Sequence, residues 1–259
     1  MSYGDKGKYW QRALSLISGC SHVSNGCANC WLAQMDYRFK NCNKECANCP
    51  KPSGCLTIKN FLTGKIEWTG NILFHEDRIG IPLKVKKPTV FAIWSDFGLL
   101  PLEIMNRVIT MIRGCSRHTF IILTKRPENI LPLWSWGGSF NKGEYLDNIY
   151  WGVSVENQKA ADERIPLLLK LQGKLILSVE PMLEKIDIRK YLAAALGESD
   201  PYRPTFQQVI VGCESGKNAR PTDNNWIRDL RDQCEAAKIP LFIKQINFNG
   251  KINKGVIEI

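Results

Sequence analysis

The amino-acid sequence predicts an α/β fold, a full or partial (β/α) barrel formed by a single domain of 259 residues. Two patterns predict it. Short runs of apolar, β-branched and aromatic residues recur along the chain, and most of them precede a segment with helical periodicity. Repeated βα units of this kind build a parallel sheet, and about seven of them suffice to curl it towards a barrel, with an open doubly wound sheet as the alternative.

The strands and helices are expected in a regular order. The first strand is ALSLISGC (residues 13–20), and a cysteine-rich insert follows it at about 40–57. The later strands lie in TVFAIWSDFG (89–98), HTFIILTKRPE (118–128), NIYWGVSVEN (148–157), KLILSVEP (174–181), QQVIVGCESG (207–216) and IPLFIKQIN (239–247). The clearest helices are PLEIMNRVITMIRGC (101–115), QKAADERIPLLLKLQ (158–172) and DNNWIRDLRDQCEAAK (223–238).

Polar residues follow each of the six later strands. In a parallel barrel the carboxyl ends of the strands meet at one mouth, so these side chains are expected to ring a polar, charged pocket. Any one of them alone is more simply explained as a helix cap or a rim ion pair. The strand-end residues are Ser95, Asp96, Thr124, Lys125, Arg126, Ser154, Glu156, Asn157, Ser178, Glu180, Cys213, Glu214, Ser215, Lys244 and Gln245.

Seven of the ten cysteines fall between residues 20 and 55. In a reducing compartment such a cluster indicates metal or iron-sulfur ligands rather than disulfides. Cys20, Cys27 and Cys30 follow the first strand and number three, whereas a closed structural site takes four ligands. Three thiolates on a four-iron cubane would leave one iron open for chemistry. The competing interpretation is a zinc knuckle on CANC, with His22 or a distant cysteine as the fourth ligand.

The formal net charge of +10 favours a polyanionic partner such as a nucleic acid. No run of eighteen apolar residues is present, and the first residues lack the apolar segment of a signal peptide. A soluble, cytoplasmic protein with no membrane partner is therefore expected.

Several segments together resemble a phage-associated branch of the radical S-adenosylmethionine (SAM) superfamily, distantly similar to spore photoproduct lyase. The segments are GCSHVSNGCANCWLAQMDYRF, FHEDRIGIPLKVKKPTVFAIWSD, HTFIILTKRPENI, YWGVSVENQKAADERIPLL, LSVEPML, VIVGCESGKNARP and RDQCEAAKIPLFIKQ. The resemblance covers about residues 18–245. It implies a radical SAM type of barrel, a 4Fe-4S cluster on Cys20, Cys27 and Cys30, and SAM bound by strand-end residues.

The chain departs from the superfamily pattern in its cysteine spacing. The superfamily uses C-x3-C-x2-C, whereas Cys20, Cys27 and Cys30 have the spacing C-x6-C-x2-C. The usual spacing occurs instead in the insert, which lacks a preceding strand and contains a fourth thiol. We therefore expect a second, closed site there, holding either an auxiliary 4Fe-4S cluster or zinc. Its ligands would be Cys42, Cys46, Cys49 and Cys55.

The resemblance also suggests roles for the strand-end residues. Ser95 and Asp96 would meet the SAM amino group, and Lys125 and Arg126 its carboxylate or a substrate phosphate. Ser154, Glu156 and Asn157 would contact the ribose and adenine. The residues expected to face the substrate are Glu180, Glu214, Lys244 and Cys213. The Cys213 thiol could return a hydrogen atom to a product radical, or it could be an ordinary buried side chain.

The expected substrate is a nucleobase in phage DNA or a modified nucleoside, with a flavodoxin- or ferredoxin-type reductant as partner. The expected reaction is isomerisation of a hypermodified thymidine, which would regenerate SAM, or a lyase or repair step like that of spore photoproduct lyase. Trp134 and Trp136 could stack on a splayed base or pack internally. The alternatives are a non-catalytic zinc module that binds nucleic acid, and a radical enzyme acting on RNA or a peptide.

Overall fold

A curled, open sheet of eight strands forms the centre of the computed structural model, which describes residues 7–39, 54–135, 137–141, 144–194, 204–215, 218–248 and 251–256. The strand order in the sheet follows the chain. The strands are β1 (Arg12–Leu14), β6 (Val90–Ile93), β7 (Thr119–Thr124), β8 (Ile149–Ser154), β9 (Lys174–Val179), β10 (Thr205–Gly212), β11 (Leu241–Phe248) and β12 (Lys251–Val256).

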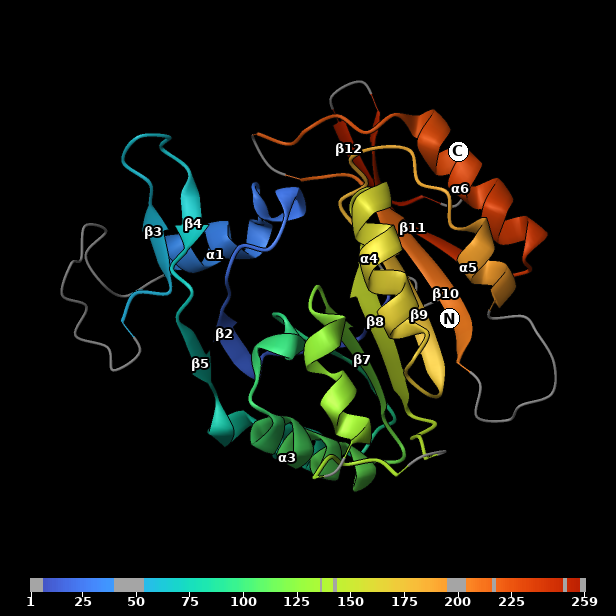
Figure 1. Ribbon diagram of the computed structural model, residues 1–259. Helices are drawn as coiled ribbons and strands as arrows, with labels where there is room; N and C mark the ends of the chain where they lie inside the picture. The colour runs from blue at the N-terminus through green and yellow to red at the C-terminus, as the bar shows by residue number, and fades with distance from the viewer. Residues whose placement is uncertain are drawn as a thin grey trace.

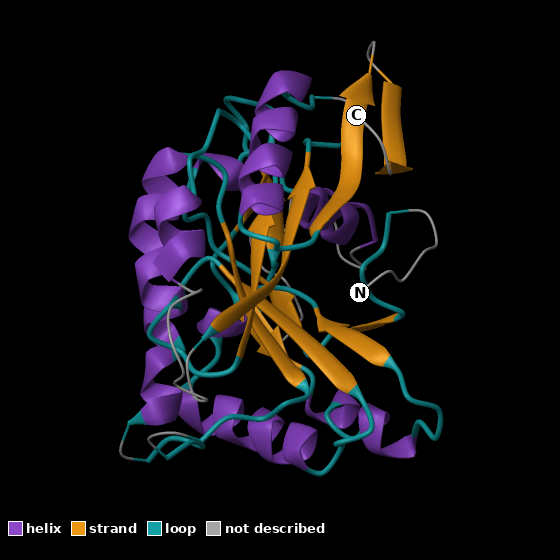
Figure 2. Cartoon of the chain, turned by 90° about the vertical axis from the view of Figure 1, so that its right-hand side faces the viewer, coloured by secondary structure: helices purple, strands orange, loops and turns teal. Residues whose placement is uncertain are grey.

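The first seven strands of this sheet run parallel, and β12 pairs antiparallel with β11. The sheet does not close, because β1 and β12 form its two edges. It is thus a partial α/β barrel, as the repeated βα pattern predicts, and Figure 2 shows helices along the outer side of its curled strands.

The helices follow the strands as the periodicity predicts. The α-helices are α1 (Trp31–Phe39), α2 (Ile81–Lys84), α3 (Leu102–Arg113), α4 (Gln158–Leu168), α5 (Arg189–Ala194) and α6 (Asn224–Ala236). The short 3-10 turns are η1 (Asn25–Cys27), η2 (Glu76–Arg78), η3 (Phe97–Leu99), η4 (Pro127–Asn129) and η5 (Leu131–Trp134). Asn157 and Asp223 cap α4 and α6 by accepting hydrogen bonds from backbone N–H groups of the first turn. No helix among these described segments is long and apolar enough to cross a membrane.

The strands alternate their side chains between two cores. Outward residues pack against the helices in the large core, whereas inward residues form a small inner core of Tyr9, Val90, Ile121, Ile176 and Ile210. The next inward layer combines three small residues, Ala92, Gly152 and Ser178, with the larger Leu123. Because the three small residues fill little volume, space remains above the inner core at the carboxyl ends of the strands.

The predicted first strand is two strands. β1 joins the main sheet, but β2 (Ile17–Gly19) pairs antiparallel with β5 (Ile72–Phe74) outside it. The chain turns between them, where the Leu16 N–H donates to the Leu14 carbonyl at 3.1 Å. Leu16 and Ile17 are both buried, so the two-residue alternation of a single strand is broken at this point.

The segment between β1 and β6 lies across the open, inner side of the sheet. It contains β2, α1 and a two-stranded hairpin of β3 (Thr57–Lys59) and β4 (Ile66–Trp68). Figure 1 places this segment on the side of the sheet away from α4, α5 and α6. The cysteine-bearing loop is therefore brought over the carboxyl ends of the strands.

Candidate functional site

Cys20, Cys27 and Cys30 lie on the loop that joins β2 to α1, and all three are partly buried. Cys20 follows Gly19, whose φ of +87° lies in the left-handed region and whose added Cβ would approach the Asn71 carbonyl to 2.1 Å. Only glycine fits there, so Gly19 fixes the direction in which the loop leaves β2. Cys27 ends the short turn η1, and Cys30 directly precedes α1.

The three thiols line one wall of a cavity of about 240 Å³ at the mouth of the half-barrel. Inward residues of the strands, among them Ala92, Leu123 and Ser178, line it as well, together with strand-end groups. Burial, reinforced by the Asp96 carboxylate, raises the pKa of the Cys20 thiol to about 12. A cation bound at this wall would thus displace a proton from Cys20. The strand-end residues lining the cavity are Ser95, Asp96, Thr124, Lys125, Arg126, Ser154, Ser178, Glu180 and Lys244.

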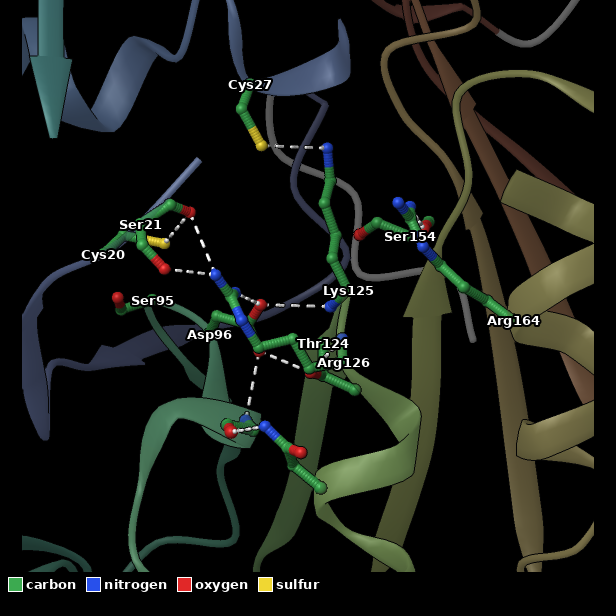
Figure 3. A network of polar contacts seen from close by, with 12 residues as sticks. Cys20, Ser21, Cys27, Ser95, Asp96, Thr124, Lys125, Arg126, Ser154 and Arg164 are labelled. Carbon is green, nitrogen blue, oxygen red and sulfur yellow. Dashed lines mark hydrogen bonds and ion pairs between the residues drawn. The ribbon is translucent and has the colours of Figure 1, made fainter. Parts of the chain in front are cut away.

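Lys125 extends from the end of β7 to the cysteine loop. Its ammonium lies 3.8 Å from the Cys27 sulfur and 3.4 Å from Glu156, as Figure 3 shows for Cys27. Glu156 is fully buried and also pairs with Arg164 at 3.0 Å. Burial alone would raise the pKa of Glu156, but the charges of Lys125 and Arg164 hold it below its ordinary value. The ionised carboxylate in turn keeps a positive charge beside Cys27.

Gly26 gives this ion pair its space. A Cβ at Gly26 would lie 2.7 Å from the Lys125 ammonium nitrogen and 3.0 Å from the Glu156 carboxylate. The absence of a side chain therefore allows the cysteine loop to approach the strand ends closely.

A second network joins the start of the loop to the ends of β6 and β7. The Asp96 carboxylate accepts hydrogen bonds from the backbone N–H of Gly98 and Lys125 and from the Thr124 hydroxyl, and it pairs with Arg126 at 2.5 Å. The same guanidinium donates to the Ser21 carbonyl at 3.0 Å and to its hydroxyl at 2.5 Å (Figure 3). Asp96 thus orients Arg126, and Arg126 holds the residue next to Cys20.

Ser95 also ties the loop to the sheet. Its φ of 70° is a left-handed conformation that is costly for a residue with a Cβ, and its hydroxyl donates to the Gly19 carbonyl at 2.7 Å. Strained backbone of this kind concentrates at functional sites, and here it lies at the rim of the cavity.

Three tryptophans form an aromatic part of the cavity lining. Trp31 and Trp94 meet edge to face at 5.4 Å, and Trp94 contacts Trp10 at 6.4 Å. Lys244 lies 5.9 Å from the Trp10 ring centre and forms an ion pair with Glu180 at 2.8 Å. All five side chains line the cavity, so one cavity combines flat apolar surfaces with a paired acid and base.

A neighbouring cavity of about 180 Å³ contains Cys213 and Glu214. It shares Cys30, Glu180 and Lys244 with the larger cavity. Burial raises the pKa of the Cys213 thiol to about 11, so this thiol stays protonated at neutral pH.

Glu214 connects the end of β10 to the cysteine loop. Its carboxylate pairs with Arg220 and accepts a hydrogen bond from the Asn29 side chain at 2.9 Å. Arg220 also donates to the Asn25 carbonyl at 2.8 Å. Asn29 lies between Cys27 and Cys30, so these contacts hold the loop at a second point in addition to Lys125.

The structure divides the residues expected to bind SAM. Ser95, Asp96, Lys125, Arg126 and Ser154 line the same cavity as the three cysteines. Glu156 and Asn157 face a different cavity, beside Glu128 and Lys159. Asn157 is the cap of α4, and Glu156 is fully occupied by two cations. Contacts of Glu156 and Asn157 with the ribose and adenine of SAM stay a prediction, and the positions of the two side chains do not support it.

The second cysteine site falls mostly outside the described residues, which exclude Cys42, Cys46 and Cys49. Cys55 is described, is partly buried, and its carbonyl accepts hydrogen bonds from Thr69 and Asn71.

Of the two tryptophans proposed to stack on a base, Trp136 is likewise outside the described residues. Trp134 stacks on Phe140 at 4.6 Å and donates its indole N–H to the Glu144 carbonyl. Trp134 is therefore a packing residue.

Sequence reasoning missed several residues of the site. Trp10, Trp31 and Trp94 lie in three separate segments, and only the folded chain brings their rings together. Asn29 and Arg220 contact partners 185 and 195 residues away in the sequence. The one available signal was local: Trp94 directly precedes the strand-end pair Ser95 and Asp96.

One family model, described as "Protein of unknown function (DUF5131)", matches residues 6–254. No curated protein and no solved structure matches the chain.

Proposed function

Because the chain belongs to the family described as "Protein of unknown function (DUF5131)", we propose its function from the chemistry of the site. The proposal is a radical SAM enzyme that acts on a nucleobase in phage DNA. Cys20, Cys27 and Cys30 would hold a 4Fe-4S cluster, and SAM would occupy the adjoining cavity.

The observation that carries this proposal is the composition of the cavity wall. Three thiols face a set of strand-end charges, and no other cysteine and no histidine lines the cavity within the described part of the chain. A four-iron cubane held by three thiolates keeps one iron available for another ligand. In the described residues, no three Cys, His, Asp or Glu side chains lie close enough to bind a single ion.

The strand-end residues fit the needs of a cluster and of SAM. Lys125 would place a positive charge beside the thiolate of Cys27, which offsets the negative charge that sulfide and thiolate ligands bring. Arg126 and Ser154 border the space beside the cluster wall, where carboxylate and hydroxyl groups of SAM would need partners. When bound, the cluster and SAM together supply a 5'-deoxyadenosyl radical by one-electron cleavage.

The aromatic wall supports a nucleobase as substrate. The rings of Trp10, Trp31 and Trp94 offer faces and edges on which a planar ring can stack. The Glu180–Lys244 pair supplies one acceptor and one donor for the polar edge of a base. These groups line the same cavity as the three cysteines, so a base held there would lie beside the proposed cluster.

Isomerisation of a hypermodified thymidine and a lyase step differ in what they need from Cys213. An isomerase that regenerates SAM would return a hydrogen atom from the methyl group of 5'-deoxyadenosine and would need no thiol donor. A lyase that releases a product radical needs one, and the protonated Cys213 thiol borders the space shared with Glu180 and Lys244. Product formation by Cys213→Ala separates the two reactions.

The test uses cluster-reconstituted protein, prepared without oxygen, to which SAM and dithionite are added. We expect 5'-deoxyadenosine from the unchanged chain and from Cys115→Ala, which removes a buried thiol of the large core. Cys20→Ala should lose this product. Undiminished product from Cys20→Ala would overturn the cluster assignment. If Cys42→Ala alone abolished the product, the two cysteine sets would have to be exchanged.

A further inference from the structure

The tip of the β3–β4 hairpin exposes two large apolar side chains. Phe61 is 98% and Leu62 is 91% exposed, more than any other large apolar residue described. A fully exposed phenylalanine next to a fully exposed leucine is unfavourable in water unless a partner covers them.

Hydrogen bonds of Asn60 and of the backbone stabilise the turn that presents these residues, so the Phe61 and Leu62 side chains are not needed to hold it. The Asn60 side-chain oxygen accepts hydrogen bonds from the backbone N–H of Leu62 and Thr63, both at 3.0 Å. The Asn60 N–H donates to the Lys65 carbonyl at 2.7 Å, and Gly64 closes the turn with a φ of +67°. The two apolar side chains are therefore displayed on a preformed support.

The charge around the tip is positive. Lys59 and Lys65 flank the turn and are exposed. Glu67 is the acidic residue of the two strands, and the Asn60 amide donates to its carboxylate at 3.1 Å. An apolar tip between two cations suits a partner with an anionic surface and an apolar interior.

The hairpin is rooted at the proposed active site. Trp68, the last residue of β4, lines the same cavity as the three cysteines. Buried Thr57, its partner across the hairpin, donates its hydroxyl to Asp36 of α1 at 2.7 Å. About 7 Å of strand separates Trp68 from Ile66, where β4 begins after the turn. Figure 1 shows the hairpin beside α1, with its turn extending away from the sheet.

We propose that Phe61 and Leu62 form a wedge that enters the base stack of duplex DNA and fills the gap left when the target base turns into the cavity. The inference rests on the proposed function for its substrate. A base must leave the duplex to reach an enclosed site, and apolar side chains inserted between base steps are a known means of unstacking. Lys59 and Lys65 would contact the phosphates on either side.

The partner could instead be an anionic membrane, since exposed apolar tips with flanking lysines also bind lipid surfaces. DNA is favoured because the hairpin adjoins an aromatic cavity in which a planar base could stack. Binding to a lipid surface would not explain why the hairpin and this cavity lie together.

The test measures binding of the full-length chain to a short duplex with one T·T mismatch and 2-aminopurine next to it. The fluorescence of 2-aminopurine rises when its neighbours unstack. We expect the unchanged chain to raise it and to bind this duplex more tightly than a matched one. The double variant Phe61→Ala/Leu62→Ala should lose the fluorescence rise and bind the mismatched duplex about tenfold more weakly.

Two controls make the result specific. Leu83→Ala removes an exposed apolar side chain from α2, far from the hairpin in sequence, and should behave like the unchanged chain. Phe61→Trp keeps an apolar wedge and should keep the fluorescence rise. An unaltered rise with the double variant, no binding to DNA by the unchanged chain, or sedimentation with anionic phospholipid vesicles that depends on Phe61 and Leu62 would each overturn the wedge.

This assay needs neither iron nor SAM. If the chain unstacks the duplex but forms no 5'-deoxyadenosine, the wedge is supported and the proposed radical SAM activity is contradicted. If the chain forms 5'-deoxyadenosine but leaves the duplex stacked, the radical SAM activity is supported and the wedge is contradicted.

Discussion

Lys125 shows how one residue of this site serves two purposes. Its ammonium contacts the Cys27 sulfur and at the same time neutralises the buried Glu156. Neither partner is near it in the sequence, and a lysine at a strand end is equally consistent with a rim ion pair. The sequence therefore identified Lys125 as a candidate but could not indicate that it approaches a cysteine.

We predict that Lys125→Met lowers the free energy of unfolding by about 1–2 kcal/mol, because Glu156 would retain only Arg164 as a charged partner. Chemical denaturation at neutral pH measures the change. Lys159→Met is the matched control, since its ion pair with Glu163 is exposed and should contribute little. Equal effects of the two substitutions would show that the Lys125–Glu156 contact is not formed.

The contribution of Glu214 to the stability of the folded chain is expected to depend on pH. Burial would raise its pKa, but hydrogen bonds from Arg220 and Asn29 leave it below the ordinary value of 4.5. A pKa lowered by folding adds stability above the unfolded pKa, and that stability is lost as the pH falls through the folded pKa. Glu214→Gln should therefore be less stable than the unchanged chain by about 2 kcal/mol at neutral pH, and this difference should shrink below about pH 4.5.

Denaturation midpoints of both chains, measured across this pH range, test whether the ionised Glu214 carboxylate stabilises the folded chain. Glu163→Gln, at an exposed carboxylate, is the control and should show little difference at neutral pH. A Glu214→Gln difference that stayed constant down to the acid limit would contradict an ionised Glu214 in the folded chain.

At the level of elements, local periodicity was a good guide to the sheet. The six later strands and three main helices lie where apolar runs and amphipathic segments predict them. The first strand was mispredicted because Leu16 and Ile17 are both apolar, and a run of apolar residues does not reveal a turn within it. The pairing of β2 with β5 and the path of the cysteine loop depend on contacts across the fold.

A substitution at Gly152 tests the packing beneath the cavity. A Cβ there would lie 2.5 Å from a Leu123 methyl group and 2.7 Å from the Ile176 carbonyl. We predict that Gly152→Ala lowers the free energy of unfolding by about 1–3 kcal/mol through overpacking. Gly80→Ala is the control, because the space around its added Cβ is open. A Gly152→Ala melting temperature equal to that of Gly80→Ala would contradict this packing.

On the scale of the whole molecule, three connections hold the cysteine loop over the half-barrel: Arg126 at its start, Lys125 at Cys27, and Glu214 with Arg220 at its end. They come from the end of β7 and from the segment that follows β10. The fold thus holds the loop at several points before any ligand binds, which favours a site of fixed geometry.

The net charge of +10 predicts a strong salt dependence of DNA binding. Neutralising only three phosphates would weaken binding roughly 40-fold for about a fourfold rise in salt concentration. Titrations of a labelled duplex at several salt concentrations give the slope. A slope near zero would mean that the basic residues do not contact the phosphates.

The central claim is that Cys20, Cys27 and Cys30 hold a cluster with one iron open to SAM. Its most direct test is the electron paramagnetic resonance spectrum of the reduced triple variant Cys42→Ala/Cys46→Ala/Cys49→Ala, recorded with and without SAM. This variant keeps the first three cysteines but removes three of the four expected ligands of the second site. We predict a single 4Fe-4S signal whose g values shift when SAM is added. Zinc in place of iron, or an iron-sulfur signal that SAM leaves unchanged, would contradict the claim.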